Sequence, residues 1–356
     1  MYAKMMNTHI LVSQIRGDKY KKKSAQNELW KGQSHHAYWN GGAAGIYENE
    51  LRKAVYRSLI EAEKITRATE IFAPSILSVD YDMDNRIEYL YQGSELNAYI
   101  HSLGGALFEL DFLPASWNYL DTMVDREGSG RRDPAGGSCP YERKAFLDHF
   151  FPEQGSPEEF RDGRLCECGD FLARPYDMVE LNRALPELLM RRDGAVGRDG
   201  AVGGGSPLRL EKRFVFRPRS IDVYYGLTNT GDAAFSSMFG VEINVSLAGR
   251  TADSGRLFLL EDDKKREISS GVTEMDGVQG LLVHDVLNEV SITLSSAREF
   301  RCWNLPVETP CGSGPVPRSE FQSHCFVPQW RLSLAPGERW ENHLSVAFEK
   351  VQSAQG

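Results

Sequence analysis

Apolar side chains recur at steps of three and four residues between residues 47 and 68, in the stretch YENELRKAVYRSLIEAEKITRA. Charged residues occupy the opposite face. The apolar stripe consists of Leu51, Val55, Leu59, Ala62 and Ile65. This spacing predicts an amphipathic helix that packs on another element. Shorter helical patterns in 1–16 and 19–33 are separated by Gly17-Asp18, a combination that ends one helix and starts the next. We therefore expect a helical subdomain over residues 1–72.

After Pro74 the apolar period changes to two. In FGVEINVSLAG (239–249) apolar and polar residues alternate, which predicts a half-buried antiparallel strand. Six further stretches have strand character: IEYLY (87–91), ALFELDF (106–112), IDVYYGLT (221–228), VSITLS (290–295), WRLSL (330–334) and HLSVAF (343–348). Many strands without long helices between them indicate a sandwich or barrel. The expected fold class is α+β, mainly β, with an antiparallel β-sandwich over residues 73–356.

The segment RRDGAVGRDGAVGGGSP contains the hexad RDGAVG twice in tandem. Its glycines and small side chains offer little apolar surface for packing. The sequence therefore predicts a mobile surface loop near residues 192–206.

Charge and hydropathy exclude several classes of partner. The chain has 50 acidic and 41 basic side chains and a formal net charge of -9, which is unfavourable for binding nucleic acid. It has no apolar run of about 18 residues that would span a bilayer. The six cysteines include no CxxC pair and are expected to be reduced thiols. These features predict a cytoplasmic protein without a membrane or nucleic-acid partner.

Alternating aspartates mark one candidate metal site. Asp80, Asp82 and Asp84 in DYDMDNRIEYL are spaced like the first half of a calcium loop, with Glu88 beyond them. Asn85 stands where such a loop has a glycine, and Tyr91 where it has a bidentate glutamate. Calcium is thus the one cofactor that the sequence suggests, and an acidic, solvated turn before a strand is the alternative.

The stretch KGQSHHAYWNGG (31–42) is a candidate sugar-binding site. Tyr38 and Trp39 offer aromatic faces for the C–H surface of a sugar ring, and Gln33 and Asn40 offer amides for its hydroxyls. Adjacent histidines on a helix point about 100° apart, which disfavours joint binding of a metal. A packing role for the aromatic pair stays open at this point.

Several stretches resemble the family 57 glycoside hydrolases of the 4-α-glucanotransferase and α-amylase type. They include YAKMM…QIRGDKYKKKSAQNELWKGQ, the helix from residue 46, GSELNAYIHSLGGALFELDFLPASWNYLDT (93–122), YERKAFLDHFF (141–151) and PQWRLSLAPGERW (328–340). The resemblance covers nearly the whole chain. It implies a helical subdomain beside a glucan cleft, followed by a β-supersandwich similar to galactose mutarotase. The family's catalytic glutamate and aspartate lie on a barrel that precedes the resembling region, so the resemblance implies a chain that is inactive alone.

The family's cleft signature, Gln-x-x-Asp-x-Tyr-Trp-His-Gly, aligns with residues 33–41 of this chain. Gln33, Tyr38, Trp39 and Gly41 match it, whereas His36 takes the place of the aspartate and Asn40 that of the histidine. The resemblance therefore implies that Gln33, His36, Tyr38, Trp39 and Asn40 contact an α-glucan or malto-oligosaccharide. An aspartate accepts hydrogen bonds only, so a histidine in its place changes the contact.

Alternatives for the function remain open. The chain could be half of a split enzyme that pairs with a separately encoded barrel, or it could form a homo-oligomer through apolar residues left uncovered on the helices. It could also be a mutarotase-like sugar epimerase that uses a histidine and a glutamate. The histidines available for that chemistry are His101, His149, His284, His324 and His343.

Overall fold

The computed structural model of the chain describes residues 1–39, 45–68, 72–124, 141–197, 205–261, 264–311 and 318–351. Its N-terminal part consists of α1 (Tyr2–Gln14), α2 (Lys19–Gly32) and α3 (Asn49–Arg67). Gly17 turns the chain with φ of +82°, and the Asp18 side chain accepts a hydrogen bond from the Lys21 amide at 2.8 Å. The predicted break between the two helices is thus present: α1 ends at Gln14, shortly before Gly17, and Asp18 caps the start of α2.

The predicted apolar stripe of α3 is buried among the helices, where Val55, Leu59 and Ala62 pack with side chains of α1 and α2. Gly32 lets α2 approach α3 closely, because a Cβ there would lie 2.5 Å from Leu59 Cδ2. A short 3-10 helix η1 (His35–Tyr38) follows α2, and a second, η2 (Gly45–Tyr47), precedes α3.

The remainder of the chain is mainly antiparallel sheet. The strands are β1 (Ser75–Val79), β2 (Glu88–Gln92), β3 (Leu96–His101), β4 (Ala106–Phe112), β5 (Trp117–Asn118), β6 (Ala145–Phe151), β7 (Asp177–Asn182), β8 (Glu187–Val196), β9 (Ser206–Phe216), β10 (Ser220–Asn229), β11 (Phe235–Val245), β12 (Gly255–Glu261), β13 (Lys264–Ile268), β14 (Thr273–Asp285), β15 (Val290–Cys311), β16 (Arg318–Leu334) and β17 (Arg339–Lys350). Short helical turns η3 (Leu113–Ala115), α4 (Pro157–Arg161) and η4 (Ala252–Ser254) lie between them. The predicted strands are therefore present.

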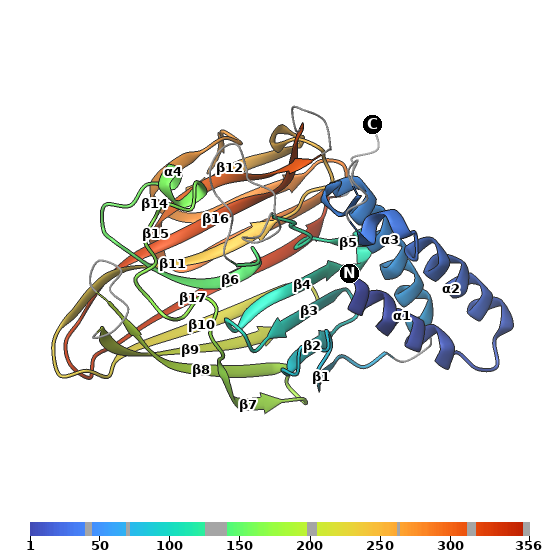
Figure 1. Cartoon of the computed structure of the whole chain (residues 1–356), viewed down its shortest axis with the longest axis horizontal. Helices are drawn as coiled ribbons and strands as arrows, with labels where there is room; N and C mark the ends of the chain where they lie inside the picture. Colours follow the sequence, from blue (N-terminus) through green and yellow to red (C-terminus); the bar gives the residue numbers. More distant parts are fainter. Residues whose placement is uncertain are drawn as a thin grey trace.

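Strand β15 connects two sheets because its two ends pair with different neighbours. Residues 290–296 pair with β17, which continues through β10, β9 and β8 to β7. Residues 301–311 pair with β16, which continues through β11 and β6 to β4, β3, β2 and β1. The helices α1 to α3 cluster at one end of these strands (Figure 1).

A large apolar core lies between the two sheets. Phe146 and Phe150 from β6 pack with Phe214 from β9 and with residues of β10, β11 and β17. One buried ion pair crosses this core, since Lys212 Nζ of β9 lies 2.6 Å from Asp148 Oδ2 of β6. The architecture is the predicted antiparallel supersandwich.

Several charged side chains of α1 and α3 are also buried, which the sequence did not predict. Lys4 of α1 is 1% exposed; it contacts Asp111 and lies 3.0 Å from Glu109 on β4. Arg52 of α3 is equally buried and lies 2.9 Å from Asp121. A buried charge is tolerated only when it is paired and hydrogen-bonded. These ion pairs therefore fasten the helices to the sheets.

Two strand expectations need correction. Strand β11 is antiparallel as predicted, but it is buried on both faces and not on one, because Glu242 and Asn244 are each 0% exposed. Their face is covered by polar partners, described below. The first RDGAVG copy is no loop: Arg192 to Val196 belongs to β8 and pairs with β9. The second copy, residues 198–203, lies outside the described residues.

In the described parts of the chain no helix is long and apolar enough to cross a membrane.

Candidate functional site

The turn between α2 and α3 carries the predicted sugar-binding residues. The Tyr38 hydroxyl donates to the Gly32 carbonyl at 2.6 Å, and the Ile46 amide donates to the Trp39 carbonyl at 3.0 Å. Arg52 Nη1 in turn donates to the Ile46 carbonyl at 2.6 Å. The turn is thus held at both ends by the helices. Asn40 and Gly41 lie outside the described residues.

Gln33, His36 and Trp39 are exposed on this turn, whereas Tyr38 is half-buried against the helical core. Trp39 is 57% exposed, a large fraction for a tryptophan. The rings of His35 and His36 lie 4.0 Å apart at 35°. Burial raises the pKa of Tyr38 well above its usual value, so the phenol stays a hydrogen-bond donor. Tyr38 therefore anchors the turn, and Trp39 offers the free aromatic face.

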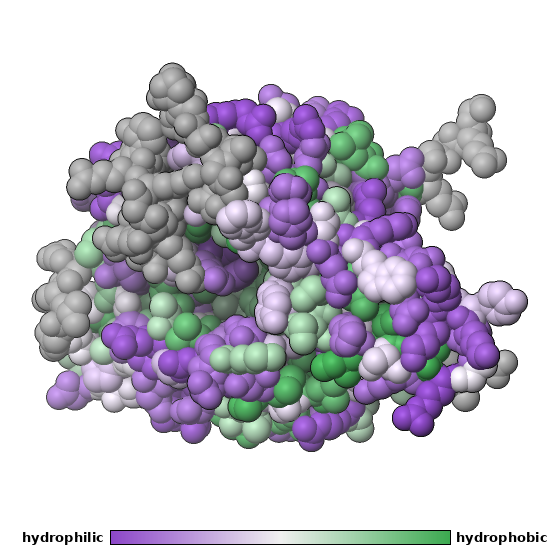
Figure 2. Space-filling view, turned by 45° about the vertical axis from the view of Figure 1, so that its right-hand side comes forward, coloured by the Kyte–Doolittle hydropathy of each residue, from purple (hydrophilic) through white to green (hydrophobic). Residues whose placement is uncertain are grey.

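The surface seen with the helical end turned forward is mixed. Hydrophobic residues appear there as separate patches among hydrophilic ones (Figure 2). Tyr2, Ile10 and Tyr20 are large apolar residues exposed on α1 and α2. Apolar area is thus left uncovered on the helices at Ile10, which is 50% exposed, whereas Val55, Leu59 and Ala62 of the α3 stripe are buried.

The loop between β1 and β2 brings part of the predicted calcium set together. Asp82, Asp84, Glu88 and His101 place ligand atoms within 4.8 Å of one another. Asp80 is not among these four; its Oδ2 accepts a hydrogen bond from the Asn85 amide at 3.2 Å.

Asn85 stands where a calcium loop has a glycine, and its φ of +66° is the left-handed conformation that such a turn requires. Glu88 and His101 face each other because the β2–β3 register pairs them. Burial raises the pKa of Glu88 to about 7, and the negative charges of Asp82 and Asp84 act in the same direction.

A second polar cluster is buried between β6 and β11. His149 Nδ1 lies 2.8 Å from Glu167 Oε2, and its Nε2 lies 3.1 Å from Glu242 Oε2. Glu242 also accepts hydrogen bonds from Tyr141 at 2.6 Å and Arg143 at 3.3 Å. Burial alone would lower the pKa of His149, but both carboxylates outweigh it and raise the pKa to about 9. The ring is therefore a buried imidazolium, and both its nitrogens are engaged.

Other histidines of the sandwich differ in how far they are exposed to solvent. Burial lowers the pKa of His324 to about 4. His343 stacks on Tyr224 with ring centroids 4.4 Å apart, and its Nε2 lies 3.3 Å from Asp222 Oδ1. It lines a groove of about 850 Å³ together with Glu341.

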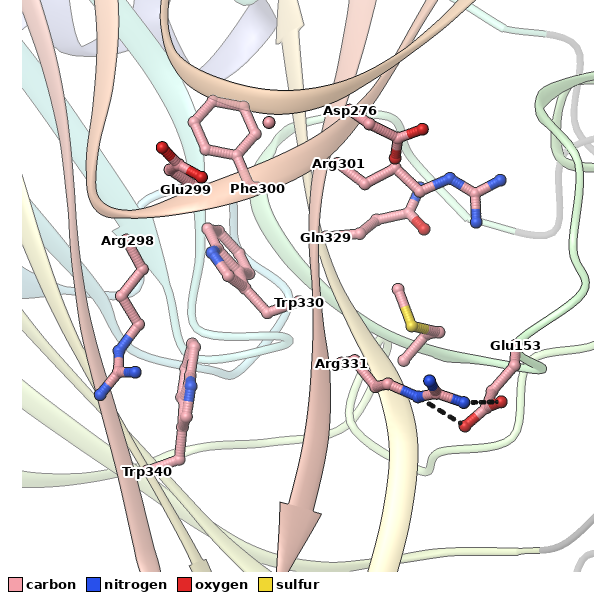
Figure 3. A pocket seen from close by; sticks show the side chains of 12 residues that line it. Glu153, Asp276, Arg298, Glu299, Phe300, Arg301, Gln329, Trp330, Arg331 and Trp340 are labelled. Atoms are coloured by element: carbon pink, nitrogen blue, oxygen red, sulfur yellow. Dashed lines mark hydrogen bonds and ion pairs between the residues drawn. The ribbon is translucent and has the colours of Figure 1, made fainter.

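A further groove, of about 630 Å³, opens where β14 to β17 come together (Figure 3). Trp330 and Trp340 lie in it with ring centroids 5.7 Å apart, and the Arg298 guanidinium lies 5.8 Å from the Trp340 ring centre. Arg331 is paired with Glu153 at its edge. Aromatic faces next to planar polar groups suit a polyhydroxylated ligand. No single stretch of sequence reveals this groove, because its lining side chains come from several different strands.

Comparison with known proteins gives consistent relatives for both parts of the chain. Residues 1–66 match the family described as alpha-amylase/4-alpha-glucanotransferase, middle domain. Residues 139–344 match the one described as alpha-amylase/4-alpha-glucanotransferase, C-terminal. The 4-alpha-glucanotransferase of Thermococcus litoralis is 23% identical over 315 residues, covering 80% of this chain and 43% of that protein. Alpha-amylase 1 of Dictyoglomus thermophilum is 24% identical over 353 residues, covering 91% of this chain and 48% of the relative.

Solved structures confirm the fold. The crystal structure of the Thermococcus litoralis 4-alpha-glucanotransferase superimposes with a TM-score of 0.76 at 20% identity, covering 98% of this chain and 49% of that one. A galactose mutarotase-like protein from Clostridium acetobutylicum gives a TM-score of 0.52 at 10% identity, covering 78% of this chain and 98% of its own. The chain spans about half the length, or less, of the curated relatives it matches.

Proposed function

Because the chain belongs to the alpha-amylase/4-alpha-glucanotransferase family, we propose that it is the α-glucan-binding, non-barrel portion of such an enzyme. The proposed contact surface is the turn with Gln33, His36 and Trp39. The observation that carries the proposal is the exposure of Trp39. Its indole is 57% exposed, and the turn that bears it is held by hydrogen bonds at both ends. A rigid, exposed aromatic face binds with little loss of conformational entropy.

The proposed contact uses different groups for different parts of a glucose unit. The Trp39 indole covers the apolar C–H face of the ring, and the Gln33 amide both donates to and accepts from hydroxyl groups. His36 supplies one donor and one acceptor when neutral, where the family signature has an acceptor-only aspartate. Tyr38 takes a supporting role in this proposal, since its hydroxyl is used by the Gly32 carbonyl.

We further propose that the chain does not cleave or transfer α-1,4-glucans by itself. Retaining glycoside chemistry needs one ionised and one protonated carboxyl group about 5 Å apart across the scissile bond. This proposal rests on the implication of the resemblance that the family carries that pair on a barrel. Purified chain incubated with maltoheptaose should leave the distribution of chain lengths unchanged in chromatography. Redistribution that scales with the concentration of this chain would contradict the proposal.

A barrel, whether separately encoded or part of the same polypeptide, is the proposed macromolecular partner, and self-association is the alternative. Tyr2, Ile10 and Tyr20 support this because such exposed apolar residues favour packing against a partner. Light scattering of the whole chain tests the alternative directly. A monomer at high concentration would exclude self-association, whereas a dimer that dissociates on Ile10→Asp substitution would support it.

A mutarotase-like epimerase remains the second candidate, supported by His343 and Glu341 in a common groove. His149 is a poor general base because both its ring nitrogens face carboxylates and the ring is 1% exposed. Polarimetry with freshly dissolved α-D-glucose and α-D-galactose distinguishes the candidates. We expect no acceleration of mutarotation by the chain. Acceleration that is lost in His343→Ala would favour the epimerase.

Glucan binding is tested by calorimetric titration of maltoheptaose into the purified chain. Trp39→Ala should weaken binding roughly 5- to 30-fold, corresponding to about 1–2 kcal/mol for an aromatic contact. Trp30→Ala is the matched control, because Trp30 is 54% exposed on the preceding helix and already lies under Lys23. Equal affinity of the Trp39 variant and the wild type would refute the site. Loss of binding in Trp340→Ala would instead locate the glucan-binding site in the groove of Figure 3.

A further inference from the structure

The acidic loop between β1 and β2 contains a buried carboxylate oxygen that lacks a hydrogen bond. Glu88 is 0% exposed; its Oε2 accepts from the Tyr81 amide at 2.6 Å, but its Oε1 receives no hydrogen bond among the described residues. Oε1 points into the group formed with Asp82, Asp84 and His101. A buried anionic oxygen without a donor costs free energy unless something else neutralises it.

The surroundings of that oxygen are strongly negative. Asp82 and Asp84 approach from the exposed side, and His101 Nε2 lies 3.4 Å from both Glu88 Oε1 and Asp84 Oδ2. Three carboxylates thus face one imidazole. Even a protonated ring would leave an excess of negative charge, because a single positive charge opposes three negative ones.

We infer that Asp82, Asp84 and Glu88 form a Ca²⁺ site that fixes the β1–β2 loop against β3. The inference is independent of the proposed glucan site, since it rests on other residues. It differs from the sequence prediction by exchanging Asp80 for the buried Glu88.

The spacing of the ligand atoms is compatible with calcium. Calcium–oxygen bonds of 2.3–2.6 Å allow opposite ligands to lie up to about 5.2 Å apart. The atoms of the cluster lie within 4.8 Å of one another, which is inside that limit. Calcium also accepts a flexible set of carboxylate, carbonyl and water oxygens, whereas magnesium demands near-ideal octahedral geometry.

His101 presents a protonated nitrogen to this site and not a ligand. The Leu103 amide donates to His101 Nδ1 at 2.9 Å, so the proton of a neutral ring is on Nε2, which faces the carboxylates. A nitrogen that carries a proton cannot ligate a metal. Oxygen-only ligation favours calcium over zinc, whose protein sites mostly use nitrogen and sulfur ligands, and leaves the remaining calcium positions to water or backbone carbonyls.

The expected affinity follows from the ligand count. Three carboxylates on a partly exposed loop correspond to a Kd of roughly 10⁻⁵ to 10⁻³ M. Because the ion binds the folded loop and not the unfolded chain, it stabilises the fold. At a hundredfold excess over Kd, the melting midpoint should rise by roughly 3–5 °C.

The experiment uses the whole chain after treatment with a chelator, titrated with CaCl₂, MgCl₂ or ZnCl₂ in calorimetry and thermal melting. Asp82→Asn combined with Asp84→Asn should abolish the calcium-dependent shift without lowering the midpoint in chelator, because it removes like charges. Glu158→Gln, at an exposed position of α4, is the matched control and should retain the wild-type shift.

Two outcomes would overturn the site. One is the absence of a calcium-dependent shift in the wild type up to 10 mM, roughly tenfold above the weakest expected Kd. The other is an equal shift in the double variant and the control, which would place binding elsewhere. Tighter binding of Zn²⁺ than of Ca²⁺, lost in His101→Gln, would overturn the assignment of His101 as a donor.

Discussion

Replacing the buried His149 by glutamine should change how stability depends on pH. In the folded chain the imidazolium lies between Glu167 and Glu242, and its pKa is about 9, against an ordinary value of 6.5. Glutamine fills similar space and does not titrate. The difference in unfolding free energy between wild type and variant therefore isolates the contribution of the imidazolium.

A pKa of about 9 in place of the ordinary 6.5 corresponds to about 3 kcal/mol of stabilisation, at about 1.36 kcal/mol for each pKa unit. The interactions with Arg143 and His149 lower the pKa of Glu242 to about 2, but this is the same ion pair seen from its partner and adds no second contribution. Because the folded pKa is raised, the stabilisation is complete below about pH 6.5. It is lost as pH rises through about 9.

Urea unfolding at pH 6.0, 7.5 and 9.5 measures this difference. Wild type should exceed His149→Gln most at pH 6.0, and the excess should shrink by about 3 kcal/mol by pH 9.5. His9→Gln, at an exposed position of α1, controls for the loss of a histidine as such. A wild-type excess that stays constant across this range would refute the buried imidazolium and reopen His149 as a candidate base.

Three further changes test the packing. Lys4→Met should destabilise the fold by about 3–5 kcal/mol in urea, because it leaves buried carboxylates uncompensated, whereas exposed Lys19→Met should have little effect. Gly32→Ala should cost about 1–3 kcal/mol, since the added Cβ meets Leu59; unchanged stability would mean that α2 can move away from α3. Mild trypsin should cut slowly after Arg192, which is paired in β8 and bonded to Asp170; rapid cutting would restore the loop assignment.

Periodicity identified the helices and strands because it depends on neighbours within one element. The stripe of α3 and the alternation in β11 are local patterns, and both elements formed where expected. Burial of the polar faces could not be foreseen in the same way. Lys4 meets Asp111 across 107 positions of sequence, and Glu242 meets His149 across 93. From the sequence alone a charged helix face is expected to face solvent, because the distant residues that pair with it are not known.

The candidate sites were predictable to different degrees. The aspartates of the acidic loop stood out by spacing, but Glu88 and His101 joined them only through the register of β2 and β3. That register follows from a hairpin, so a strand-pairing argument could have found it. The groove with Trp330 and Trp340 depends on the association of β14 to β17, and local sequence carries no signal for it. At the turn after α2 the sequence indicated candidate sugar-binding side chains, but not that the Tyr38 hydroxyl would anchor the turn.

Hydrogen exchange of the whole chain, with and without saturating maltoheptaose, tests most directly whether this chain binds an α-glucan at the turn after α2. We predict slower exchange in peptides that cover Gln33 to Trp39 and no change with cello-oligosaccharides, whose β-linkages present a different shape. Slowing confined to peptides around Arg298 and Trp330, or no slowing anywhere under saturating ligand, would contradict this account.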